Sequence, residues 1–132
     1  MNGLDTNVLV RYFAQDEPRQ SAAARRLIQA RLTRELPGHV NVVTLAETCW
    51  VLKRLYAAGR DELIQVVENL LAAPNIVVDQ RALVRKALQH FAASASGFSD
   101  CLIAQLNLDA GCASTLTFDR GAAKLAGFEL LA

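Results

Sequence analysis

Acidic side chains recur at the points where the sequence pattern changes from strand-like to helix-like. These acids are Asp5, Glu47, Asp79, Asp100 and Asp119. Each has a local structural explanation, because Asp is a favoured helix N-cap and an acid in the first turn is stabilised by the helix dipole. The stretch TLAE, for example, predicts a capping box with Thr44 as the cap and Glu47 three residues later. Taken singly, every one of these acids is explained by helix capping.

Taken together, the same acids indicate a cation site. Right-handed crossovers bring the C-terminal ends of parallel strands to one edge of a sheet, and α/β proteins bind their ligands at that edge. Carboxylates gathered there would repel one another by about 1–4 kcal/mol per close pair, depending on the local dielectric. Helix capping does not require such crowding, whereas a divalent cation explains it.

The donor set favours Mg²⁺ or Mn²⁺ over zinc. All candidate ligands are carboxylates, and neither the two histidines nor the three cysteines fall in a ligand-like spacing. A carboxylate-held metal can activate a water molecule and stabilise the attacking and leaving oxygens of a phosphoester. The residues alone therefore predict metal-dependent hydrolysis of a phosphoester, and they do not choose between RNA and a small phosphate compound.

Alternating strands and helices must position these acids. The pattern of apolar residues and turn formers predicts strands near 1–4, 39–43, 75–79, 112–118 and 128–131, and helices near 6–14, 18–35, 44–59, 61–73, 80–95, 99–111 and 119–127. Pro18 suits a helix start, and Gly59 suits a helix end. Strands separated by helices need crossover connections, so we expect an α/β fold: a three-layer α/β/α sandwich with a mostly parallel central sheet of about five strands.

Composition narrows the class of protein. A chain of 132 residues that is 52% hydrophobic can bury a core as one domain, residues 1–132, and is not a disordered tail. It has no apolar run of about 18 residues and no basic-then-apolar leader, so we expect no membrane span and no secretion signal. The cysteines show no CxxC spacing and are interpreted as reduced, mostly buried side chains of a cytoplasmic protein.

Basic residues are concentrated in the first half of the chain. Residues 1–60 contain nine Lys and Arg against five Asp and Glu, whereas residues 61–132 contain five against eight. The excess lies mainly in the stretch RQSAAARRLIQARLTRE, where Arg19, Arg26 and Arg34 would fall close together on one face of a helix. Such a stripe is either a solvated helix face or a patch that binds phosphates beside an active site, and the pattern leaves both open.

Four motifs resemble the PIN-domain family, and most closely the VapC toxins of bacterial toxin–antitoxin pairs. They are LDTNVLVRYF, TLAETCWVL, GFSDCLIAQLNLDAGC and TLTFDRGAAKL, in the family's order and spread over nearly the whole chain. The first strand, MNGL, is less apolar than is usual in the family. The family consists of Mg²⁺- or Mn²⁺-dependent endoribonucleases that a cognate antitoxin protein holds in check. The resemblance therefore implies a PIN-like fold, an RNA substrate, one or two Mg²⁺ or Mn²⁺ ions and an antitoxin partner. It also implies a homodimer, for which the apolar faces of 45–56 and 62–71 are candidates.

The resemblance also assigns residues to roles. The family's acidic quartet corresponds here to Asp5, Glu47, Asp100 and Asp119. Asp5 and Asp100 would be the principal metal ligands, while the other two would bind the metal or its waters and orient the nucleophile. Supporting positions, expected to hydrogen-bond these carboxylates, are occupied by Thr6, Asn7 and Thr117. Asp79 has no counterpart in the quartet and is interpreted as a helix N-cap.

Other conspicuous residues receive weaker assignments. With the resemblance added, contacts to RNA phosphates or to acidic parts of the antitoxin are expected from Arg11, Arg19, Arg25, Arg26 and Arg120. The aromatic residues Trp50 and Tyr56 are predicted to pack in the core or in a dimer interface rather than to stack on bases. His39 and His90 belong to no motif, so a cyclic phosphate route has no histidine pair. We therefore expect attack by a metal-activated water, with 5′-phosphate and 3′-hydroxyl products.

Three alternatives remain at this point. A haloacid-dehalogenase-like phosphohydrolase would begin DxDx[TV], but Asn7 occupies the position of the second acid. A receiver-like phosphoacceptor domain would need an acidic pair at the first strand and a lysine at the end of a late strand, and neither is evident. A catalytically silent binding module on a PIN scaffold is the third, and a lack of divalent-metal binding would distinguish it.

Overall fold

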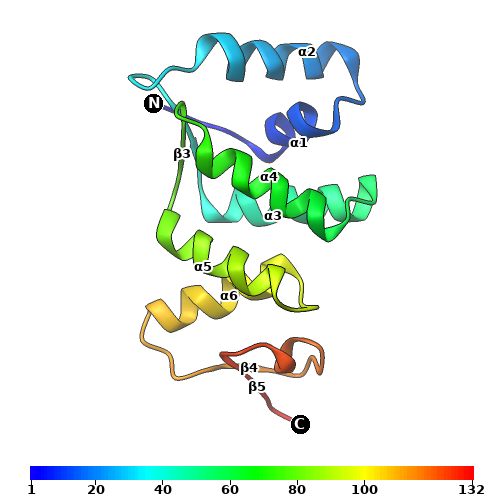
Figure 1. The fold of residues 1–132 in the computed structure, drawn as a ribbon, viewed down its shortest axis with the longest axis vertical. Coiled ribbons are helices and arrows are strands. Elements are labelled where there is room, and N and C mark those ends of the chain that lie inside the picture. Colours follow the sequence, from blue (N-terminus) through cyan, green and yellow to red (C-terminus); the bar gives the residue numbers. More distant parts are fainter. The chain divides into compact units, whose positions relative to one another are not determined.

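Parallel strands and α-helices build both of the units into which the chain divides (Figure 1). The computed structural model describes residues 1–132, and the two units are Met1–Gln80 and Arg81–Ala132. The first contains a three-stranded sheet of order β1-β2-β3, and the second contains the pair β4-β5. Every strand pairing is parallel. The predicted α/β class with parallel strands joined by helices is therefore confirmed.

The first unit carries four of the six α-helices. Its elements are β1 (Asn2–Gly3), α1 (Thr6–Ala14), α2 (Pro18–Arg26), the π-helical segment η1 (Leu27–Arg31), β2 (Gly38–Val40), α3 (Val42–Tyr56), α4 (Arg60–Ala72) and β3 (Ile76–Val78). Helix α1 packs against both α2 and α3, and α3 lies beside α4 (Figure 1). The helices between successive strands supply the crossovers that parallel pairing requires.

Strand β1 is short and exposed, yet the residue that follows it is firmly held. The Leu4 N–H donates to the His39 carbonyl at 2.9 Å, which extends the pairing of β1 with β2. The Leu4 side chain is buried and lies against Gly38, where an added Cβ would be only 2.8 Å from Cδ1 of Leu4 and of Leu32. Glycine at this position therefore lets β2 approach the chain directly before Asp5.

The helix predicted over 18–35 ends earlier than expected. It begins at Pro18 as predicted, but α2 passes into the π-helical turn of η1, in which the Leu32 N–H donates to the Leu27 carbonyl at 2.9 Å. The Asn75 side-chain amide donates to the carbonyls of Ile28, at 2.6 Å, and Leu32, at 3.3 Å. These carbonyls lie at a helix end, where the helix itself supplies no partner, so the amide caps η1 from a distant part of the chain.

The predicted boundaries of α3 are wrong at both ends. The helix begins at Val42, because the Asn41 side chain accepts the Thr44 N–H at 2.7 Å and acts as the N-cap, so Thr44 is not the cap of a capping box. At the other end Ala57, with φ of 54°, takes the left-handed position expected for Gly59, which instead directly precedes α4. The N-cap lies three residues and the left-handed end two residues earlier than predicted, and Glu47 remains within the helix.

The second unit places two helices before its strand pair. Its elements are α5 (Arg81–Ala92), α6 (Phe98–Asp109), β4 (Thr115–Thr117), the 3₁₀ turn η2 (Ala122–Lys124) and β5 (Phe128–Leu130). Helices α5 and α6 pack together, and the buried rings of Phe91 and Phe98 meet edge to face at 5.6 Å. The helix expected over 119–127 is reduced to η2. None of the helices has the length and apolarity needed to cross a membrane.

Candidate active site

Asp5 and Glu47 lie together in the first unit. Asp5 follows β1 and is the N-cap of α1, with its Oδ1 accepting the Thr6 N–H at 2.8 Å. Glu47 comes from α3, which packs against α1. The buried Thr6 hydroxyl donates to Glu47 Oε1. One threonine therefore orients both carboxylates, the first through its backbone and the second through its side chain.

These two carboxylates open into a cavity of about 330 Å³. Its lining consists of Asp5, Thr6, Asn7, Val10, Arg11, Glu47, Val51, Leu55 and Tyr56. Both acids are exposed, so solvent and ligands reach them. The wall contributed by α3 beyond Glu47 is apolar apart from the tyrosine hydroxyl. No histidine or cysteine belongs to this lining.

Tyr56 and Arg11 form a hydrogen-bonded network at the wall of this cavity. The Arg11 Nη1 donates to the Tyr56 hydroxyl at 3.1 Å and to Asp16 Oδ1 at 3.3 Å, and the Tyr56 hydroxyl donates to Asp16 Oδ2 at 2.7 Å. The hydrogen bond from Tyr56 lowers the pKa of the Asp16 carboxyl below its ordinary value, and the same bond raises the pKa of the Tyr56 phenol. This role of Tyr56 was not predicted from the sequence, because its partners are 40 and 45 residues away.

Asp100 and Asp119 lie together in the second unit. Asp100 is the third residue of α6, which begins after Gly97, and its side chain turns back so that Oδ2 lies 3.7 Å from the position of a Cβ on that glycine. Asp119 Oδ1 accepts the backbone N–H groups of Gly121, at 2.8 Å, and Ala122, at 3.3 Å. Asp119 is therefore held by turn geometry, and Asp100 lies in the first turn of α6.

This second pair lines a cavity of about 500 Å³. The lining is formed by Ala93, Ser94, Ala95, Ser96, Gly97, Asp100, Asp119, Gly121, Ala122 and Lys124. The segment between α5 and α6 contributes small side chains, which leave room for a bulky ligand. As in the first unit, the lining contains two carboxylates and neither histidine nor cysteine.

The supporting residues differ in how they contact the acids. The Thr6 hydroxyl binds a carboxylate, as the prediction stated. Thr117 acts on the backbone, because its Oγ1 accepts the Asp119 N–H at 3.0 Å. Asn7 is exposed and lines the cavity that contains Asp5. Asp79 is exposed after β3 and lies two residues before α5, so the position directly before that helix belongs to Gln80.

The predicted contact arginines are mostly exposed. Arg19, Arg26 and Arg120 lie at the surface, and the exposed Arg25 donates to the side chain of Gln15. Arg11 is half-buried and its guanidinium belongs to the network with Asp16 and Tyr56. Their contacts with RNA or with a partner protein stay predictions.

The donor set of both cavities fits Mg²⁺ or Mn²⁺. Within neither unit do three or more His, Cys, Asp or Glu side chains converge on one point. Two carboxylates per cavity are the number that Mg²⁺ commonly takes from a protein, with waters and substrate phosphates completing its octahedron. Zinc would require softer nitrogen or sulfur ligands, which neither lining supplies.

Comparison with known proteins identifies the family. A family model described as the PIN domain matches residues 4–128, nearly the whole chain and all four acids of the two cavities. No curated protein matches the chain significantly. PIN domains are nuclease domains, hydrolases of nucleic acid that generally use divalent metal ions such as Mg²⁺. The chain belongs to the PIN domain family.

Proposed function

We propose that this chain is a Mg²⁺- or Mn²⁺-dependent endoribonuclease in which residues 1–132 act as one domain. The observation that carries the proposal is the pairing of carboxylates in two cavities, one in each unit. Asp5 lies with Glu47 in one cavity, and Asp100 lies with Asp119 in another. These are the four positions that match the acidic quartet of the family, and no other pair of acids shares either cavity lining.

Metal binding is assigned to these four acids. We take Asp5 and Asp100 as the principal ligands and Glu47 and Asp119 as ligands of the metal or of its waters, for one or two ions in total. Such an ion, when bound, supplies an activated water and neutralises charge that develops on the phosphate oxygens.

The chain's own residues fix the ligands before metal binds. Thr6 holds Asp5 through its N–H and Glu47 through its hydroxyl, and the N–H groups of Gly121 and Ala122 hold one oxygen of Asp119. Carboxylates oriented in this way lose less freedom when they bind an ion. Neither cavity offers a histidine as general base for the 2′-hydroxyl. We therefore expect direct attack by water, which leaves 5′-phosphate and 3′-hydroxyl ends.

The cellular role that we propose is that of the toxin in a VapBC-type pair. The support is the resemblance of the four motifs to VapC toxins. A cognate antitoxin and a second copy of the chain are the proposed partners. On α3 the side chains of Trp50 and Leu55 are 55% and 69% exposed and suit such contacts. The apolar residues of 62–71 are largely buried within the protomer, so we assign the proposed dimer surface to 45–56 alone.

The test is cleavage of a mixed pool of tRNA and structured RNA by purified protein in Mg²⁺, Mn²⁺ or EDTA. Asp5→Asn and Asp100→Asn each remove a proposed ligand while leaving the shape of the side chain, and Asn remains a good N-cap at position 5. Asp79→Asn is the matched control, because Asp79 is an exposed acid after a strand that lines neither cavity. We expect metal-dependent cutting by the wild type and by the control, and its loss in both ligand variants.

Two results would contradict the proposal. Equal cutting by the wild type and both ligand variants would show that the acids are not the metal site. A wild-type protein that cuts no RNA and binds no Mn²⁺ in titration calorimetry would be a silent binding module on a PIN scaffold. Recovery of 2′,3′-cyclic phosphate ends would retain the ribonuclease but reject direct attack by water.

A further inference from the structure

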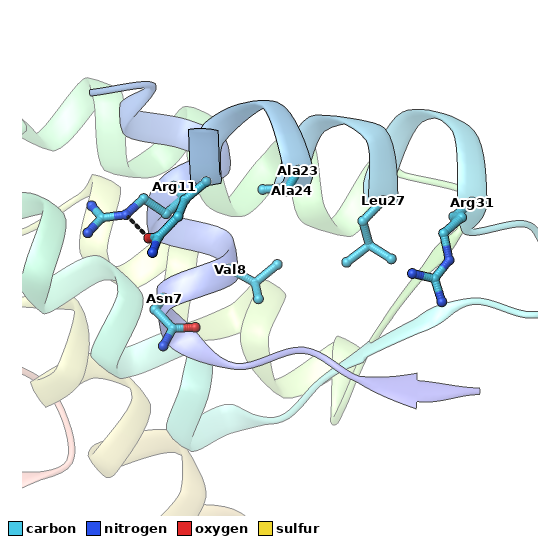
Figure 2. Close-up of a pocket in the computed structure, with 8 residues that line it drawn as sticks. Asn7, Val8, Arg11, Ala23, Ala24, Leu27 and Arg31 are labelled. Carbon is cyan, nitrogen blue, oxygen red and sulfur yellow. Dashed lines mark hydrogen bonds between the residues drawn. The ribbon is translucent and has the colours of Figure 1, made fainter. Parts of the chain in front are cut away.

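A further cavity of the first unit lies between α1 and α2 (Figure 2). Its volume of about 380 Å³ falls within the usual range of sites for small organic ligands. The walls are apolar and are formed by Val8, Ala23, Ala24 and Leu27. Two of these are Ala23 and Ala24, consecutive residues of α2, whose small side chains keep the wall low and leave room for a planar group.

Polar side chains stand at the rim of this cavity. Asn7 and Arg31 lie at opposite ends of it, and Arg11 is bound to Gln20 by a hydrogen bond of 2.7 Å from Nε to Oε1 (Figure 2). Arg31 is exposed. The apolar wall, the Asn7 amide and the exposed Arg31 cation together suit a ligand that has a planar apolar part, a polar edge and a negative charge.

The cavity adjoins the one that contains Asp5. Asn7 and Arg11 line both cavities, and Asn7 is only two residues after Asp5. The Arg11 guanidinium is fixed between them by its bonds to Gln20, Asp16 and Tyr56. A chain-like ligand whose phosphate lies at Asp5 would therefore pass Asn7 and enter the apolar cavity with its next group.

The charge of the surrounding segment matches a polyanion. Residues 18–34 contain five arginines and no acidic residue. Phosphate contacts by Arg and Lys supply most of the sequence-independent affinity for nucleic acids. Single-stranded RNA alternates anionic phosphates with planar bases. Arg31 suits a phosphate, and the wall formed by Ala23 and Ala24 suits the adjoining base.

We propose that the cavity between α1 and α2 receives one unpaired base of the RNA substrate, beside the phosphodiester that is cut. The base lies against Ala23 and Ala24, the Asn7 amide donates to and accepts from its polar edge, and Arg31 binds the adjoining phosphate. This site deepens the endoribonuclease function proposed above and rests on it. Under this proposal Asn7 is a specificity residue, whereas Arg31 contributes affinity through the phosphate.

The test compares two substitutions that are seven residues apart, one on α2 and one on η1. Ala23→Leu fills the cavity, and Ala30→Leu is the matched control, because Ala30 is exposed on η1 and lines neither cavity. A fluorescent single-stranded RNA is titrated in EDTA, so that binding is measured without cutting. We expect Ala23→Leu to weaken binding by about five- to a hundredfold, the range for loss of one base contact, and the control to match the wild type.

Two further measurements keep the result interpretable if Ala23→Leu perturbs folding. Arg31→Gln changes only an exposed cation, and we expect it to lower the slope of log affinity against log salt by about one. Methyl NMR of the wild type reports directly on Val8, Ala23 and Leu27 during titration with the same RNA or with poly-glutamate. We expect RNA, and not the acidic peptide, to shift these signals.

The outcomes separate this site from the proposed function. Equal RNA affinity of the wild type, Ala23→Leu and Arg31→Gln overturns the base site even if the wild type cuts RNA in Mg²⁺. Methyl shifts caused by poly-glutamate alone overturn it as well and make the cavity a protein-docking site. If RNA shifts the methyl signals of this cavity but the protein never cuts RNA, the ribonuclease function is rejected and the base-binding site is retained.

Discussion

Gly38→Ala is expected to destabilise the protein through the contact that anchors Asp5. The new Cβ would lie 2.8 Å from Cδ1 of both Leu4 and Leu32, closer than real Cβ contacts come. Both leucines are buried, at 7% and 9% exposure, so neither methyl group has open space into which to rotate. Relief of the contact requires the two leucine side chains to repack or β2 to move away from the chain that carries Asp5.

The expected magnitude follows from two opposing effects. Overpacking of a core by one methyl group costs about 1–3 kcal/mol. Replacing glycine by alanine also stiffens the unfolded chain, which stabilises the folded state by about 0.4–1 kcal/mol where the backbone permits it. The midpoints of these ranges give a net loss of about 1.3 kcal/mol, with an upper limit of about 2.6 kcal/mol, and for a chain of this length the midpoint lowers Tm by about 5 °C.

Thermal and urea unfolding followed by circular dichroism measure this loss. Gly3→Ala is the matched control, because Gly3 lies on the neighbouring strand and an added Cβ there meets nothing within 4 Å. We expect the control to be as stable as the wild type or slightly more stable. Metal affinity is a second readout, because displacement of Leu4 moves the residue that follows it, Asp5.

A double-mutant cycle with Leu32→Ala tests the cause. Alone, Leu32→Ala should cost about 2–5 kcal/mol. In the Gly38→Ala background it should cost less, because it removes one side of the clash, with a coupling of about 0.5–3 kcal/mol. Equal stability of Gly38→Ala, Gly3→Ala and the wild type would refute the argument that close approach of β2 requires glycine.

Three further perturbations test other contacts of the structure. The Thr6→Val variant should fold, but its metal affinity or cleavage rate should be about 10–100-fold lower, because it lacks the hydroxyl that orients the Glu47 carboxylate. Calorimetry with Mn²⁺ measures this loss, and unchanged binding would show that the contact does not matter. Tyr56→Phe should lower stability in a pH window that urea titrations can map. The depressed pKa of Asp16 means that its share of the contact is fully present above the ordinary value of 3.8 and is lost as pH falls below it, whereas the raised pKa of Tyr56 means that its share is fully present below 10.0 and is lost as pH rises above it. A stability difference between Tyr56→Phe and the wild type that does not change with pH would contradict this assignment. In native protein a maleimide should label the exposed Cys112 and spare Cys49, whose burial raises its pKa to about 12, and mass spectrometry of both peptides before and after denaturation decides this.

Features with local causes were predicted well from the sequence. Helix α1 was expected over 6–14 and is observed at Thr6–Ala14, because Asp5 caps it through the adjacent N–H. The start of α2 at Pro18 was likewise predicted. The order of the four motifs placed the chain in the PIN family, which the family comparison confirms. The roles of the individual acids stay predictions.

Competition between equally good local signals produced the errors at α3. Asn41 and Thr44 are both favourable caps, and the sequence offers no means of choosing between them. The structure selects Asn41, and the helix begins three residues earlier. Ala57 in a left-handed conformation is unfavourable in isolation, so no propensity would have preferred it to Gly59.

The sequence by itself determined which residues can do chemistry and which local element holds each of them. Capping, periodicity and turn chemistry act over a few residues, so their pattern is visible in the chain. Only the tertiary structure decided which distant groups meet. The Thr6 hydroxyl donates to Glu47 across 41 residues, and Arg11 donates to Tyr56 across 45. The Asn75 amide donates to the Ile28 carbonyl across 47 residues and so caps η1. These contacts depend on how helices and strands pack, and packing is set by the whole core rather than by any short segment.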